Sequence, residues 1–327
     1  MRLPAVIAKR LGYAVALLFA VLVLNFTLLY LAPGDAAETI AGEAGGASPE
    51  MLAKIRKDYG LDLPFLDQLY LYLLKVVQGD FGHSFYFDQP VTTVIFENLA
   101  PTLLLVVSSL LIAISFGTFL GVFAARRPNG LLSQIITVLA LLGYALPVFW
   151  TGIMLIILLA SVIPLFPTSG MDSGPLGAAG FGYVWEVLHH LALPVLTLST
   201  IYLAFYSRLS RASMMDVLGA DYIRTARAKG LNERVVVFKH ALRNAVLPVV
   251  TFAGLQFGAL FSGAVLVETV FSWPGLGTLA FDSILRRDTP TLLGILFFSA
   301  LIVIVANLLT DLAYRLVDPR IKSAARA

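Results

Sequence analysis

The sequence predicts an all-α protein that crosses a membrane six times, with an extracytoplasmic insertion between the first and second spans. Three observations predict this class. Of the 327 residues, 58% are hydrophobic and only 13% are charged, about half the charged fraction of an ordinary soluble domain. The mean hydropathy is +0.86. The charged residues are also clustered, so that long stretches of the chain contain none.

Six stretches lack Asp, Glu, Lys and Arg altogether: 11–32, 99–124, 131–163, 191–207, 246–267 and 291–310. About 20 apolar residues in a helix cross the roughly 30 Å core of a bilayer, and five of the six stretches reach that length. Because backbone polar groups in lipid must be paired within the segment, we expect helices. The alternating pattern of a membrane β-barrel is absent.

Two of these stretches need a further comment. The fourth, 191–207, is short, and we expect it to be extended through His189 and His190 or to Ser210. The third, 131–163, is too long for one straight span. Pro147 lies near its middle and removes a backbone donor, so a kink is predicted there.

The first stretch follows a positively charged start and resembles a signal peptide in that respect. Its apolar run of 22 residues is longer than a typical signal-peptide core. We therefore expect an uncleaved first helix.

The charge distribution predicts the orientation. With six spans, both termini lie on one side of the membrane, and that side holds 17 of the 23 basic residues and only five acidic ones. Its net charge is +12, against −9 on the other side. Basic connections stay in the cytoplasm, so we expect a multi-pass membrane protein with both termini cytoplasmic. This explanation of the basic residues leaves no need for nucleic acid as a partner.

Four regions follow from these spans: the N-terminus with the first helix (1–32), an extracytoplasmic insertion (33–98), a transmembrane core with spans two to six (99–310) and a cytoplasmic tail (311–327). Within the insertion, Ser48-Pro49-Glu50 is typical of a helix start and Gly60 of its end. A second helix is expected from Pro64 to Gln78, ended by Gly79. Its apolar face would comprise Leu66, Leu69, Leu73 and Val76.

The long cytoplasmic connection, 208–245, is helical in pattern. Its first helix would end at Gly230, and Asn232 would cap a second helix with Glu233 in its first turn. Ala226, Ala228 and Gly230 are small enough for another surface to approach the backbone closely. Composition leaves two interpretations open, a basic amphipathic helix at anionic lipid headgroups and a docking helix for a cytoplasmic partner.

Several kinds of chemistry are missing from the sequence. The spans carry no ionisable side chains apart from histidines at the edges, which argues against an ion-coupled carrier. The motifs of metalloproteases, serine hydrolases and Walker-type nucleotide sites are absent, as are cysteines. We therefore expect no catalytic residues, no metal site and no cofactor in this chain, so its energy must come from elsewhere.

Five motifs in order resemble a known family. They are Leu31-Ala32-Pro33-Gly34-Asp35, Gly79-Asp80-Phe81-Gly82-His83-Ser84, the pair formed by residues 220–231 (ADYIRTARAKGL) and 240–245 (HALRNA) before Pro248, the run 268–277 (ETVFSWPGLG) with Arg287-Asp288-Thr289-Pro290, and Asp318-Pro319-Arg320. Together they resemble ABC-importer permeases of the dipeptide/oligopeptide/nickel subfamily. The large outer segment resembles the first, B-type permease of such systems.

The resemblance implies roles for particular residues. The first half of the cytoplasmic pair corresponds to the EAA loop, whose helix couples the permease to an ATPase subunit. It comprises Asp221, Arg224, Thr225, Ala226, Arg227, Ala228, Lys229 and Gly230. The generic motif has Glu six positions before the Gly, where this chain has Arg224, so the contact of that acid is not transferred. The subfamily commonly has Arg-Thr-Ala-Arg-Ala-Lys-Gly.

At the outer end, Pro274-Gly275-Leu276-Gly277 requires a turn. Together with Glu268 and Asp288, Pro274, Gly275 and Gly277 are candidates for an outer gate, and a purely structural loop is the alternative.

The resemblance also implies an assembly. A second homologous permease (C-type), two ATP-binding-cassette ATPases that hold ATP and Mg²⁺, and an extracytoplasmic binding protein would complete the importer. Its substrate would be a di- or oligopeptide or a related small solute, and this chain would form half of the translocation path. The resemblance further implies that the protein lies in the bacterial inner (cytoplasmic) membrane. The rival functions are an ion-coupled secondary transporter and a membrane scaffold without transport.

Overall fold

The computed structural model describes residues 3–31, 48–58, 60–84, 86–174 and 180–317. Most of the motif at residues 31–35, the motif at 318–320 and the end of the predicted tail lie outside this part. The chain forms two compact units, one of residues 1–100 and 275–305 and the other of 101–274 and 306–327. The four regions predicted above divide the chain differently and stay a prediction.

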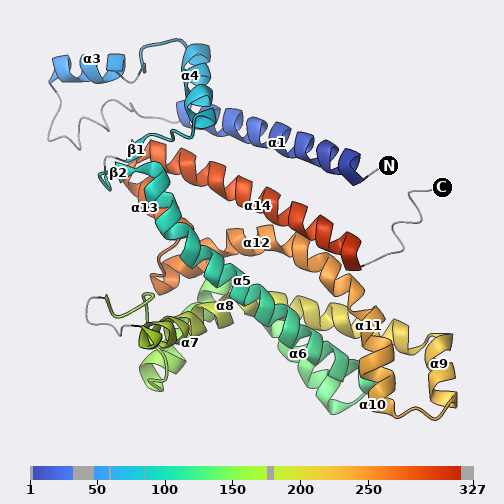
Figure 1. Cartoon of the computed structure of the whole chain (residues 1–327). Coiled ribbons are helices and arrows are strands. Elements are labelled where there is room, and N and C mark those ends of the chain that lie inside the picture. Colours follow the sequence, from blue (N-terminus) through green and yellow to red (C-terminus); the bar gives the residue numbers. More distant parts are fainter. Residues whose placement is uncertain (1–2, 32–47, 59, 85, 175–179, 318–327) are drawn as a thin grey trace. The chain divides into compact units, whose positions relative to one another are not determined.

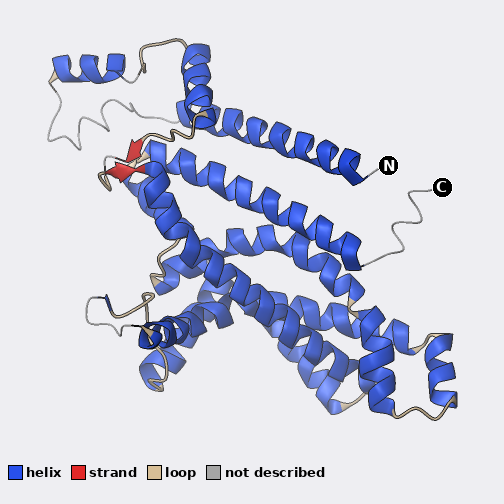
Figure 2. Ribbon diagram, in the orientation of Figure 1, coloured by secondary structure: helices blue, strands red, loops and turns tan. Residues whose placement is uncertain are grey.

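Long helices account for most of the described residues (Figures 1 and 2). Each of the six charge-free stretches coincides with a helix or with a broken pair: α1 (Leu3–Leu31), α5 (Val91–Arg126), α6 (Leu131–Ala145) with α7 (Val148–Ile156), α8 (Phe181–Leu218), α12 (Leu247–Phe271) and α14 (Thr289–Val317). Within the described residues, four helices are long and apolar enough to cross a membrane, and up to seven spans result if each bent helix pair counts as one. The predicted six lie within these bounds.

The fourth predicted span is the centre of α8, which has 38 residues. At 1.5 Å per residue this helix is about 57 Å long, nearly twice the thickness of a bilayer core. It therefore extends through His189, His190 and Ser210, as expected, and carries Arg208 and Arg211 beyond the apolar stretch.

The predicted kink at Pro147 is confirmed. α6 ends at Ala145 and α7 begins at Val148. The two parts, with the π-helix η1 (Ile157–Val162) that continues α7, meet at 106°. Leu146 has an extended backbone, as the residue before a proline prefers.

The first unit contains the two predicted outer helices, α3 (Pro49–Asp58) and α4 (Phe65–Val77). Each is followed by a glycine with positive φ, Gly60 at +66° and Gly79 at +80°. Residues that carry a side chain rarely adopt this backbone conformation. Within the predicted apolar face of α4, Val76 is buried, whereas Leu66 is 72% exposed. The aromatic rings of Phe65 and Tyr72 on α4 pack instead against α1, and this contact turns Leu66 away.

A short antiparallel hairpin, β1 (His83–Ser84) and β2 (Gln89–Pro90), corrects the expectation of a purely helical chain (Figure 2). It lies in the first unit, just before α5. The ring of Phe81, which precedes β1, packs at a tilt against the rings of Phe297 and Phe298 of α14. The Arg286 guanidinium of α13 (Leu276–Arg286) lies 3.7 Å from the centre of the Tyr86 ring in the hairpin loop. The hairpin is thus attached to helices that lie much further along the chain.

In the second unit, α8 packs against α6, α7 and α12 (Figure 1). The residues 101–126 of α5 approach α8 through Gly117 and Gly121. A Cβ atom at Gly117 would lie 2.9 Å from the Leu203 carbonyl, and one at Gly121 only 2.4 Å from the Ser207 carbonyl. Residues four apart share a helix face, so the two glycines let the two backbones come together as in other membrane helix pairs.

The histidine pair on α8 has a structural role in this unit. His189 hydrogen-bonds to the Leu165 carbonyl at 2.7 Å, and His190 hydrogen-bonds to the carbonyls of Ser169 and Gly170 at 3.1 Å. Both therefore hold the segment that follows η1. Among the described residues, no three His, Asp or Glu side chains gather as metal ligands would.

Candidate functional site

The cytoplasmic connection folds as predicted around its glycine. α9 (Asp221–Ala228) is followed by Gly230 with φ +74°. The Asn232 side chain then accepts a hydrogen bond from the Arg234 N–H and caps α10 (Glu233–Val235). A π-helix, η3 (Val236–Ala241), and α11 (Leu242–Ala245) continue the chain to α12. The predicted glycine end and asparagine cap are both confirmed.

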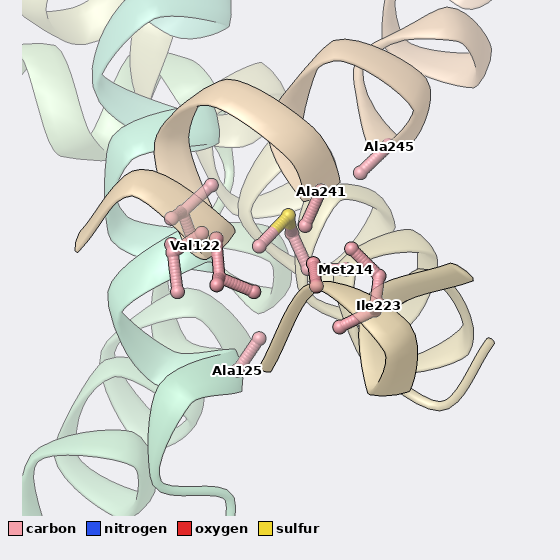
Figure 3. Packing of buried hydrophobic residues seen from close by; sticks show 9 residues of the cluster. Val122, Ala125, Met214, Ile223, Ala241 and Ala245 are labelled. Carbon is pink, nitrogen blue, oxygen red and sulfur yellow. The ribbon is translucent and has the colours of Figure 1, made fainter. Parts of the chain in front are cut away.

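One face of α9 is buried in a cluster of small and branched side chains (Figure 3). Met214 of α8 lies at its centre and is fully buried. The members are Val122, Ala125, Met214, Ile223, Ala226, Val236, Val237, Ala241 and Ala245. Ala226 is thus corrected from a surface position to a packing position: its small side chain lets α9 approach η3 and α11, and it is only 8% exposed.

The other face of α9 is exposed. It presents Asp221, Arg224, Thr225, Arg227, Ala228, Lys229 and Gly230. Asp221 and Arg224 are paired at 3.5 Å with both side chains in solvent, so this pair adds little stability. Two of these exposed residues, Ala228 and Gly230, are small, and they alternate with the long side chains of Arg227 and Lys229.

A second ion pair closes the turn after α9. Arg227 donates from Nε to Oε2 of Glu233 at 3.2 Å and from an Nη atom to Oε1 at 2.8 Å. This bidentate pair lowers the pKa of the Glu233 carboxyl and raises the pKa of Arg227. Burial opposes both shifts, while the opposite charge of each partner favours them, and the charge of Arg126 also helps to lower the pKa of Glu233.

The gate candidate Glu268 lies inside the second unit, with no exposed surface. Its Oε1 accepts a hydrogen bond from the Thr102 hydroxyl of α5 at 2.7 Å. A second hydrogen bond reaches the preceding residue of α5, because the indole N–H of the buried Trp273 donates to the Pro101 carbonyl at 3.1 Å. These two bonds fasten the end of α12 to α5.

The predicted turn at Pro274 is confirmed, since α12 ends at Phe271 and α13 begins at Leu276. Pro274 is exposed, whereas Gly275 and Gly277 are buried. In the first unit, Asp288 is only 6% exposed. It accepts hydrogen bonds from the Ser84 hydroxyl at 2.5 Å and from the Thr291 N–H at 3.3 Å. The outer candidates therefore divide between the two units, and each of the two carboxylates is bonded within its own unit.

Comparison with known proteins identifies the family. Residues 117–323 match the binding-protein-dependent transport system inner membrane component, and residues 3–117 match the N-terminal region of the same kind of membrane component. The chain belongs to this family. It is thus a membrane-spanning permease of an ATP-binding-cassette importer.

Relatives of this permease match it over nearly its whole length. It is 41% identical to the dipeptide transport system permease DppB of Escherichia coli K12, with 97% of this chain and 98% of the relative covered. It is 39% identical to the di/tripeptide permease DppB of Pseudomonas aeruginosa, with 97% and 98% covered. The oligopeptide permease AppB of Bacillus subtilis is also 39% identical, with 98% and 100% covered.

Solved structures confirm the fold of the permease. Two inward-facing crystal forms of the MetNI methionine ABC transporter are similar, with TM-scores of 0.56 and 0.54. Each match covers 69% of this chain, at 15% and 16% identity, and 97% and 96% of the solved chain. At this identity the likeness concerns the fold alone.

Sequence reasoning missed the side chains that fasten α9 within the permease. The Asn244 amide of α11 donates to the Tyr222 hydroxyl of α9 at 2.8 Å. Glu233, the first residue of α10, also accepts two hydrogen bonds from Arg227. Asn244 lies in the second half of the cytoplasmic motif, and Glu233 lies in the first turn of the helix predicted after Asn232. The available signal was that the two halves of the cytoplasmic motif occur together, although sequence alone does not say which side chains meet.

Proposed function

We propose that this permease carries di- or oligopeptides, or a related small solute, as one of two homologous permeases of an importer. The peptide assignment is supported by the names of relatives that are 39–41% identical and align over nearly the full chain. An extracytoplasmic binding protein delivers the solute to the outer side.

The proposed coupling element is α9, which docks on an ATPase subunit. The observation that carries this proposal is its exposure: only Ile223 and Ala226 of its eight residues are buried. The remaining face is mainly polar and basic, with the small residue Ala228 on it and Gly230 shortly after its end. Because so little of α9 is buried within the permease, most of its surface is available to contact the ATPase subunit. ATP and Mg²⁺ are held by that partner, and this chain performs no catalysis itself.

The proposed orientation places α9 in the cytoplasm together with both termini, in accord with the +12 charge of that side. The chain contains no cysteine, so single introduced thiols report on topology directly. Ala228→Cys should react with a membrane-impermeant maleimide only after the cells are permeabilised, and Ser173→Cys should react in intact cells. The reverse pattern would refute the orientation.

Docking is tested best at Ala228. Any bulky residue at Gly230 would also strain its positive φ, whereas Ala228 is exposed and helical. In proteoliposomes with the partner permease, ATPases and binding protein, Ala228→Trp should abolish ATP-driven uptake of a tritiated dialanine while leaving membrane insertion unchanged. Ala53→Trp, on exposed α3, is the control and should transport normally.

The outcome separates the proposal from its rivals. Normal uptake by Ala228→Trp would overturn docking through α9. Uptake by this chain without ATP, abolished by an ionophore, would identify an ion-coupled carrier instead. A failure of the complete assembly to move any peptide would refute the substrate class.

A further inference from the structure

The apolar contact between α9 and the rest of its unit is small. Ile223 and Ala226 are its buried residues, and alanine contributes little contact area. Packing of this size holds a helix against a surface but does not fix its rotation about its own axis. Additional contacts at both ends are needed if α9 is to transmit a force in a defined direction.

The first such contact is at the start of α9. The Asn244 Nδ2 atom donates to the Tyr222 hydroxyl at 2.8 Å. Asn244 belongs to α11, which ends at Ala245, and α12 begins at Leu247. α11 is itself held to α8, since the Ser213 hydroxyl donates to the Ala245 carbonyl at 2.9 Å. A displacement of Tyr222 is therefore passed to the base of α12.

The second contact is at the other end. Gly230 reverses the chain, and Asn232 caps α10, so that the first residue of α10 lies beside the last turn of α9. The bidentate bond between Arg227 and Glu233 results. Two parallel bonds fix the guanidinium in direction as well as in distance.

We infer that Tyr222–Asn244 and Arg227–Glu233 are two clasps that make α9, α10 and α11 move as one body, so that these four residues position the docking helix and determine how much transport each hydrolysed ATP yields. This inference rests on the proposed docking of α9. It assigns a task to the second half of the cytoplasmic motif, which holds the first half in place through Asn244.

The test uses the complete importer in proteoliposomes and compares the number of dialanine molecules transported per ATP hydrolysed. Tyr222→Phe and Asn244→Ala each remove one end of the first clasp and should lower this ratio about 2- to 10-fold, the factor that one hydrogen bond gives. The double variant should be no worse than the poorer single variant, because both changes break the same bond.

The second clasp is tested with its charge retained. Arg227→Lys keeps a cation on α9 but loses the bidentate geometry, and should lower the ratio by a similar factor. Tyr183→Phe, an exposed tyrosine of α8, and Arg234→Lys, an exposed arginine of α10, are the matched controls and should leave the ratio unchanged.

The results distinguish this inference from the proposed function. If the native importer couples uptake to ATP but the clasp variants keep the native ratio, the clasps are refuted and docking stands. If the effects of Tyr222→Phe and Asn244→Ala multiply in the double variant, the two residues act separately and the clasp is again refuted. If the native importer shows no ATP-dependent uptake, the proposed function itself fails.

Discussion

The Ser84 hydroxyl donates a hydrogen bond to the Asp288 carboxyl, 204 residues further along the chain, and neither residue is exposed to solvent by more than 6%. The same carboxyl accepts the Thr291 N–H at the start of α14. Two motifs of the sequence, one before α5 and one before α14, thus meet in one buried polar contact within the first unit.

Removing the Asp288 carboxyl should abolish both hydrogen bonds, the one from Ser84 and the one from Thr291. Asp288→Ala takes away a helix cap and the acceptor of Ser84, and we expect a loss of about 1–3 kcal/mol in the free energy of unfolding. Ser84→Ala should cost less, because the cap remains. Thermal unfolding in detergent measures both, with Asp62→Asn, an exposed carboxylate of the same unit, as the control. Equal stability of Asp288→Ala and the native chain would contradict the assignment.

Local signals in the sequence were sufficient for the break at Pro147 and for the ends of three helices. Pro147 broke the third stretch because proline cannot continue the backbone hydrogen bonds. Gly60, Gly79 and Gly230 ended helices because each adopts a positive φ. These effects depend on the residue itself and its neighbours, so they are visible without a structure.

Tertiary contacts were not visible in the same way. Leu66 has the spacing of a buried position but is exposed, since the rings of Phe65 and Tyr72 took the contact with α1. Ala226 was predicted to be a surface residue of the proposed docking helix but is buried in the cluster that contains Met214. Spacing predicts which residues share a face, whereas the choice of the buried face depends on what the rest of the chain presents.

The close approach of α5 and α8 predicts a strong effect at Gly121. A Cβ atom there would lie 2.7 Å from Ser210 Cβ as well as 2.4 Å from the Ser207 carbonyl, so Gly121→Ala must force the two backbones apart. We expect a loss of about 1–3 kcal/mol in stability, seen as a lower unfolding temperature. Gly263→Ala is the control, because its nearest neighbour would be the Leu198 Cδ1 atom at 3.5 Å. A similar loss in both variants would mean that helical glycines matter here for another reason.

The Arg227–Glu233 pair predicts a dependence on pH. Hydrogen bonding to Arg227 lowers the pKa of Glu233 below its usual 4.5. A carboxyl with a lowered pKa stabilises the folded state fully above its unfolded pKa, and the contribution is lost as the pH falls through the folded value.

Amide exchange in the turn after α9, corrected for intrinsic rates, should therefore stay slow from neutral pH to about pH 5 and become faster below about pH 4. Glu233→Gln should exchange fast throughout this range, and Glu50→Gln, on exposed α3, should behave as the native chain does. Acceleration already near neutral pH would show that another group controls the turn.

The buried bond from Thr102 to Glu268 predicts that a single hydroxyl contributes measurably to the second unit. Thr102→Val keeps the shape of the side chain but removes the donor from a fully buried carboxyl. Loss of a hydrogen bond to such a group costs about 1.5–3 kcal/mol, which unfolding in detergent should reveal. Thr200→Val is the matched control, since that hydroxyl donates to the Leu196 carbonyl of its own helix, and it should change stability by less than about 0.5 kcal/mol.

A second variant shows whether Thr102 acts through Glu268. In Glu268→Leu the side chain offers no acceptor to the Thr102 hydroxyl. Adding Thr102→Val to Glu268→Leu should therefore cost less than Thr102→Val costs in the native chain. An equal cost in both backgrounds would mean that Thr102 stabilises α5 without acting through Glu268.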